Sequence, residues 1–183
     1  MAFVILGLLM LRNLSQYDIR NVLQQKISPF ISASLGSIQA ALKKLENDGH
    51  VTFQEVTENG RRKKLYTLND LGREHFMEWM LSSITPSRFE QEVTTRLFFL
   101  GFMTPAERLA IIRAVVAQLE TSVQEFSAAS VEANRKEVPE NVTSVVAYQL
   151  KTLDLGLYYH QSMLTWFEKF AMELEAELGG EQT

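Results

Sequence analysis

The chain has 183 residues, of which 46% are hydrophobic and 22% charged, as is typical of a soluble globular protein with one or two domains. Because it contains no cysteine and its three histidines lack a metal-binding spacing, we expect no metal site, no cofactor and no enzymatic activity. The net charge of −4 hides an asymmetry: residues 1–85 hold ten Lys and Arg against eight Asp and Glu, whereas residues 86–183 hold eight against fourteen. The two halves therefore call for separate interpretation.

An apolar run at residues 2–11 predicts the first helix. It differs from a signal peptide because no basic residue precedes it, Arg12 follows it directly and no small-residue cleavage site comes after it. It is also about half as long as the ~20 residues that cross a bilayer. We therefore expect a buried helix in a soluble, cytoplasmic protein with no membrane contact.

Two further helices are predicted before residue 50. Ser15 and Asp18 have the spacing of a capping box, which predicts a helix that begins there and ends near Ser28 and Pro29. A third helix, over residues 35–48, is indicated by apolar residues three and four positions apart and by a glycine directly after its end. Its apolar stripe consists of Leu35, Ile38, Leu42 and Leu45, and the glycine is Gly49.

A hairpin follows the third helix. Two strand-like runs, at residues 50–56 and 64–68, flank a polar turn with Asn59-Gly60 at its tip, which is a strong hairpin signal. Another helix is expected over residues 69–83. The order of three helices, two strands and a helix predicts a winged helix-turn-helix with a two-stranded wing.

The second half is predicted to be entirely helical, so the fold class is mainly α with a small β-hairpin wing. Pro86 marks the break between a winged helix-turn-helix domain, residues 1–85, and a helical dimerisation domain, residues 86–183. Thr104 begins a second capping box, which opens a long helix that Pro139 ends. The last helix carries an apolar stripe that a second chain is expected to cover, which predicts a homodimer. The stripe consists of Leu150, Leu153, Leu157, Leu164, Phe167 and Leu174.

Two groups of residues are candidates for DNA binding. The polar face of the third helix begins with small residues that allow close approach to a major groove, and it continues with amide and ammonium groups. Four cations in a row follow the hairpin tip, where a polyanion would relieve their mutual repulsion. A solvated surface or a protected edge strand is the alternative interpretation. The candidate DNA contacts are Tyr17, Ser34, Ser37, Gln39, Lys43, Lys44, Arg61, Arg62, Lys63 and Lys64.

Several motifs in this order resemble the PadR family of transcriptional regulators. They are Ile5-Leu6-Gly7-Leu8-Leu9, Gln16-Tyr17-Asp18-Ile19-Arg20, Gly36-Ser37-Ile38, Ala41-Leu42-Lys43-Lys44-Leu45-Glu46, Gly49-His50-Val51, and the segment from Gly60 to Leu68 with Leu71-Gly72. The second half, with Arg96-Leu97-Phe98-Phe99-Leu100 and Thr104-Pro105-Ala106-Glu107, is similar to the virulence-activator-like branch. The resemblance implies a dimeric repressor or activator that binds double-stranded DNA. One departure is Gln39-Ala40, where the family usually has Tyr-Pro, so that tyrosine's contacts do not carry over.

The sequence favours a homodimeric regulator on a roughly palindromic operator, with three alternatives left open. A winged-helix module could bind an acidic protein through its wing without reading DNA. A small aromatic effector could release a repressor, with Trp79 and Trp166 as its candidate contacts beside packing roles for both. An enzyme is the most distant alternative, because no nucleophile-elbow or phosphate-loop pattern is present.

Overall fold

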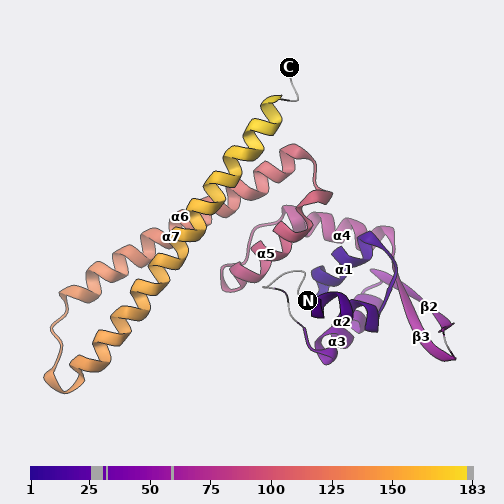
Figure 1. Ribbon diagram of the computed structural model, residues 1–183, viewed down its shortest axis with the longest axis horizontal. Helices are drawn as coiled ribbons and strands as arrows, with labels where there is room; N and C mark the ends of the chain where they lie inside the picture. The colour runs from indigo at the N-terminus through magenta and orange to yellow at the C-terminus, as the bar shows by residue number, and fades with distance from the viewer. Residues whose placement is uncertain (26–30, 32, 59, 181–183) are drawn as a thin grey trace. The chain divides into compact units, whose positions relative to one another are not determined.

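The computed structural model describes residues 1–25, 31, 33–58 and 60–180, without the side chains of Glu58 and Arg61. The chain forms two compact units, Met1–Met103 and Thr104–Thr183 (Figure 1). Among the helices described, none combines the length and the apolarity needed to cross a membrane.

Helix α1 (Ala2–Leu11) forms the centre of the first unit, as its apolar sequence predicts. Six consecutive residues, from Val4 to Leu9, are buried. A helix that is apolar all round has to be enclosed by other elements, and here α3 (Leu35–Asn47), α4 (Asp70–Leu81) and α5 (Phe89–Phe99) pack against it. Gly7 allows the Phe99 side chain of α5 to pack directly on the α1 backbone, since a Cβ at this position would lie 2.5 Å from the Phe99 ring.

Helix α2 (Gln16–Gln24) begins at the predicted cap, Ser15, and α3 begins at Leu35, as predicted. The Asp18 carboxylate accepts hydrogen bonds from the Ser15 backbone N–H at 2.9 Å and from its hydroxyl at 2.6 Å, which completes the capping box. The predicted end of α2, near Ser28 and Pro29, lies outside the described residues. Helix α3 buries Ile38, Leu42 and Leu45 as predicted.

Two details at the ends of α3 stand out. Gly49 has a φ of 74°, so the left-handed residue predicted after the helix is confirmed. Leu35 was predicted to join the buried stripe, but it is 45% exposed. Its position in the first turn of α3 places it beside α2 at the surface instead of over the core.

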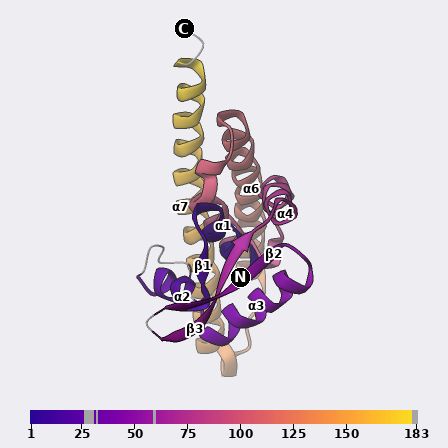
Figure 2. The same ribbon diagram turned by 90° about the vertical axis from the view of Figure 1, so that its right-hand side faces the viewer.

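The wing is a hairpin of β2 (Val51–Glu58) and β3 (Arg61–Leu68). Glu58 pairs with Arg61 and Gly60 has a φ of 75°, as expected at the tip of the hairpin, while Asn59 lies outside the described residues. The four cations lie inside β3. The predicted two-stranded wing is confirmed, and the structure adds a strand that was not predicted, because β1 (Leu14–Ser15) pairs with the other edge of β3 in the order β1-β3-β2 (Figure 2). Two residues are too few to show a strand period, so no sequence pattern reveals β1.

The boundary between the compact units lies later in the chain than residue 85. Helix α5 belongs to the first unit because Val93, Arg96 and Phe99 are buried there. The Phe99 ring meets Phe76 of α4 edge to face, with centroids 5.7 Å apart. Short 3-10 turns, Pro86–Arg88 and Leu100–Phe102, flank α5.

The second unit is a pair of long helices, α6 (Pro105–Arg135) and α7 (Thr143–Gly180), joined through a 3-10 turn at Glu140–Val142. The Thr104 capping box predicted at the start of α6 is present. The two helices run side by side along much of their length (Figure 1).

Helix α6 covers the stripe of α7 that was predicted to need a second chain. Phe167 and Leu174 are buried within one chain, and the other four stripe residues, Leu150, Leu153, Leu157 and Leu164, are half-buried. Helix α6 therefore provides part of the cover that the sequence assigned to a second chain, and the assignment of these residues to a dimer interface stays a prediction. Apolar side chains also occupy the opposite side of α7, where they are exposed. They include Tyr148, Leu155 and Trp166.

Candidate nucleic-acid interface

The exposed face of α3 is small and uncharged at its start and cationic further along. Gly36 and Ala40 are exposed on this face, and Lys43 and Lys44 follow them. Gln39, at one edge, is also exposed. Small residues let a helix approach a groove closely, while amide and ammonium groups are the donors that read base edges or meet phosphates.

Ser34 and Ser37 hold the start of α3. The Ser34 hydroxyl oxygen accepts a hydrogen bond from the Ser37 backbone N–H at 3.1 Å, and the Ser37 hydroxyl donates to the Ser34 carbonyl at 2.8 Å. The hydroxyl hydrogen of Ser37 is thus used inside the cap. Both residues are exposed at the end of the helix that carries the small residues.

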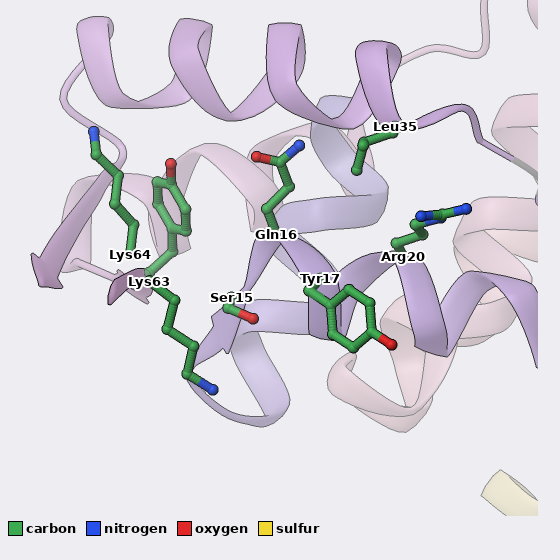
Figure 3. A pocket seen from close by; sticks show the side chains of 8 residues that line it. Ser15, Gln16, Tyr17, Arg20, Leu35, Lys63 and Lys64 are labelled. Atoms are coloured by element: carbon green, nitrogen blue, oxygen red, sulfur yellow. The ribbon is translucent and has the colours of Figure 1, made fainter. Parts of the chain in front are cut away.

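A hollow of about 380 Å³, here called the α2–wing hollow, lies between α2, the start of α3 and β3 (Figure 3). It brings together candidates from two separate segments, Tyr17 and the pair Lys63-Lys64. Sequence reasoning missed Gln16 and Arg20, which lie one helical turn apart on α2 and so face the same side. The lining residues are Ser15, Gln16, Tyr17, Arg20, Leu35, Lys63, Lys64 and Tyr66.

The wing cations differ in their surroundings. Arg62 is exposed, and the side chain of Arg61 lies outside the described residues. The Lys63 ammonium lies 3.9 Å from the Asp18 carboxylate, and the Lys64 ammonium lies 3.5 Å from the Glu46 carboxylate. The two lysines point in opposite directions from β3 (Figure 3). Both lysines are therefore paired with a carboxylate of another element.

Two carboxylates on this surface, those of Asp18 and Glu46, each lie beside a lysine of β3. Hydrogen bonds from the Ser15 side chain, and then from its backbone, lower the pKa of Asp18, and Lys63 and Arg12 add to the effect. Burial, with the nearby Glu46 charge, raises the pKa of Tyr66, which keeps its phenol a neutral donor. Two of the acidic groups beside α3 and the wing, Asp18 and Glu46, are therefore each compensated by a lysine of β3.

The candidate effector residues lie in different units. Trp79 stacks on Phe3 with ring centroids 4.3 Å apart, and the Arg96 guanidinium lies 4.9 Å from the Trp79 ring centre. The hollow beside Trp79 has a volume of only about 60 Å³, well below the ~300–1,000 Å³ of common ligand sites. Trp166 lies on α7, half-exposed against Phe167 and Phe170.

Two regulators are similar to the chain over almost its whole length. The negative transcriptional regulator PadR of Bacillus subtilis is 22% identical over 177 residues, which cover 96% of this chain and 97% of that protein. The probable transcriptional regulator Rv1176c of Mycobacterium tuberculosis is 22% identical over 172 residues, which cover 88% and 90% of the two chains.

Two solved structures match the chain with TM-scores below 0.5. The crystal structure of Bacillus subtilis PadR in complex with operator DNA matches with a TM-score of 0.45 and 22% identity, covering 94% of this chain and 98% of that one. A crystal structure of the same protein with p-coumaric acid matches with a TM-score of 0.42 and 22% identity, over 95% of this chain and 94% of that one.

The family assignment rests on the first unit. The profile described as the transcriptional regulator PadR-like family matches residues 5–78, which run from α1 through most of α4. This segment includes α2, α3 and the wing, and therefore every residue of the α2–wing hollow. Residues 5–78 therefore match the PadR-like family of transcriptional regulators, and the chain as a whole is similar to the two regulators above.

Proposed function

We propose that the protein is a sequence-specific regulator that binds double-stranded DNA as a homodimer on a roughly palindromic operator. Helix α3 enters the major groove with its small residues first, and Gln39 and Lys43 reach base edges or phosphates. Tyr17, Arg20 and Arg62 contact the phosphate backbone around the α2–wing hollow. The observation that carries the proposal is that α3 presents small and polar residues to solvent, while Tyr17, Arg20 and the Lys63-Lys64 pair line a hollow beside its first turn.

The dimer rests on the side of α7 that faces away from α6. Tyr148 is 74% exposed, Leu155 66% and Trp166 51%, so large apolar side chains line solvent over several turns. Contiguous exposed apolar surface of this kind marks protein interfaces. A second copy of α7 covers this surface, with the half-exposed edges of Leu150, Leu153, Leu157 and Leu164 at its margin.

The proposal includes no enzymatic activity and a cytoplasmic location. Its alternative is a winged-helix module that binds an acidic protein through the wing. Both would respond to salt, but only the DNA-binding regulator discriminates between DNA sequences.

The test is selection of source-genome fragments on the immobilised full-length protein, followed by titration of an enriched fragment and of a shuffled duplex. We expect binding to the enriched fragment to be about 10³-fold tighter or more at physiological salt. Equal affinity for both duplexes would contradict the proposal. The matched control is Lys151→Ala, an exposed lysine on α7 far along the chain from the winged helix, which should bind like the parent protein.

A further inference from the structure

Lys64 contacts two different elements with one ammonium group. Its Nζ lies 3.5 Å from the centre of the Phe53 ring on β2 and 3.5 Å from Oε2 of Glu46 on α3. Phe53 pairs with Tyr66 in the sheet, and Glu55 pairs with Lys64, so these side chains share one side of the hairpin. In Figure 3, Lys64 points toward the end of α3 that lies farther from Leu35. The Lys64 side chain therefore connects the wing to α3.

The contact between Lys64 and Glu46 affects how an anionic ligand can approach α3, because Glu46 carries a negative charge. It is half-buried in the last part of α3, on the same helix as Lys43. An unpaired carboxylate at this place would repel a DNA phosphate, because like charges near a surface of reduced dielectric interact over several ångströms. The Lys64 ammonium compensates the Glu46 charge before any ligand arrives.

Arg62 offers the comparison. It precedes Lys64 by two residues, so it lies on the same side of β3, where it pairs with Thr57 near the tip. Its side chain is exposed to solvent. The two cations thus lie on the same side of the same strand. Lys64 contacts Glu46 and Phe53, whereas Arg62 lies nearer the tip of the hairpin and is exposed to solvent.

We propose that Lys64 is a positioning residue that braces the wing against α3 and neutralises Glu46, and that it is not a phosphate contact. The inference rests on the proposed DNA-binding function. Holding the hairpin against α3 fixes the distance between Arg62 and the face of α3 that carries Lys43. Loss of the brace therefore weakens DNA binding without removing a protein–phosphate contact.

The first test compares salt dependence. The full-length protein and its Arg62→Ala, Lys64→Met and Glu46→Gln/Lys64→Met variants are titrated with one duplex at several salt concentrations. We expect Arg62→Ala to reduce the magnitude of the log–log slope by about 0.9, the value for one phosphate contact. Lys64→Met should keep the parent slope while losing about three- to tenfold in affinity, as fits an exposed ion pair with a cation–π contact.

The double variant separates the two roles of Lys64. Glu46→Gln/Lys64→Met removes both charges, so we expect the parent slope and an affinity between those of the parent and Lys64→Met. A slope reduced by about 0.9 in both Lys64 variants, as in Arg62→Ala, would overturn the inference. Circular dichroism on each variant confirms that the fold is retained.

The second test needs no DNA. In the free protein, lysine-labelled NMR spectra should show the Lys64 ε-methylene protons upfield of those of the other lysines, because the Nζ to which this methylene is bonded lies over the Phe53 ring. Phe53→Leu should remove this shift, and Glu46→Gln should reduce it. Lys64 resonances at the position of the other lysines would overturn the brace. A parent protein that binds no DNA would contradict the proposed function alone, because this second test would still decide whether the brace exists.

Discussion

Trp166 provides the sharpest test of the proposed dimer. Its side chain is 51% exposed on the side of α7 opposite α6. A tryptophan buries up to ~250 Å² when enclosed, so roughly 100 Å² remains to be covered by a partner. At about 25 cal/mol per Å² this area contributes ~2.5 kcal/mol for each copy. A two-fold interface contains the residue twice, which gives ~5 kcal/mol, or about 10³- to 10⁴-fold in the dimer dissociation constant.

The perturbation is Trp166→Glu, measured by sedimentation equilibrium over a range of protein concentrations. We expect dissociation into monomers at concentrations where the parent protein is dimeric. The matched control is Gln161→Glu, which adds the same charge at an exposed position on another side of α7 and should leave the dimer intact. An unchanged dissociation constant in Trp166→Glu, with helicity retained, would refute the assignment of this side of α7 to the dimer.

Three further predictions concern the winged helix. Lys43→Ala should weaken operator binding by ~1–3 kcal/mol more than binding to random DNA in competition gel shifts, and equal losses on both would show that this lysine does not read sequence. Gly72→Ala should destabilise the first unit by ~1–3 kcal/mol in thermal unfolding, because the added methyl overlaps the His50 carbonyl oxygen. The exposed Leu71→Ala is its control and should change stability by no more than ~0.5 kcal/mol. Burial, and then the neighbouring His50, lower the pKa of His75 below its ordinary value of 6.5. The folded state therefore binds fewer protons than the unfolded chain, and the free energy of unfolding falls as the pH drops through 6.5. Melting temperatures at pH 7.5 and 5.5 should differ in the parent and differ less in His75→Phe, and identical pH dependence in both would contradict this origin.

The elements that the sequence predicts well have local causes. Residues 2–11 are apolar all round, which leaves a buried helix as the stable solution. The Ser15 and Thr104 capping boxes involve residues three positions apart, and the Asn59-Gly60 turn defines a hairpin by itself. Because these signals are local, the corresponding helices and the hairpin form in the predicted segments. The two strands extend closer to the tip than the predicted runs at residues 50–56 and 64–68.

The parts that were missed depend on residues far apart in the chain. Strand β1 exists only because β3 lies beside it, some fifty residues later. Arg96 anchors α5 in the first unit through hydrogen bonds to the carbonyls of Ser82 and Ser83, and a lone arginine in a helical pattern predicts no such burial. The apolar stripe of α7 shows that one side needs a cover but does not say whether α6 or another chain provides it.

The candidate site combines both kinds of information. The exposed face of α3 follows from helical periodicity, because the buried residues Ile38, Leu42 and Leu45 define the opposite side. The partners of Lys63 and Lys64 do not follow from periodicity, because Asp18 and Glu46 lie on other elements. Four adjacent cations therefore looked equivalent in the sequence and are not equivalent in the structure.

Hydroxyl-radical footprinting of the full-length protein on an enriched genomic duplex tests the central claim most directly. A homodimeric regulator with two recognition helices should protect two groups of nucleotides related by a dyad, with centres about one helical turn or a multiple of it apart, ~10–10.5 base pairs per turn. The protection should disappear on a duplex in which one half-site is scrambled. Protection that is single, without a dyad, or the same on scrambled DNA would contradict the account.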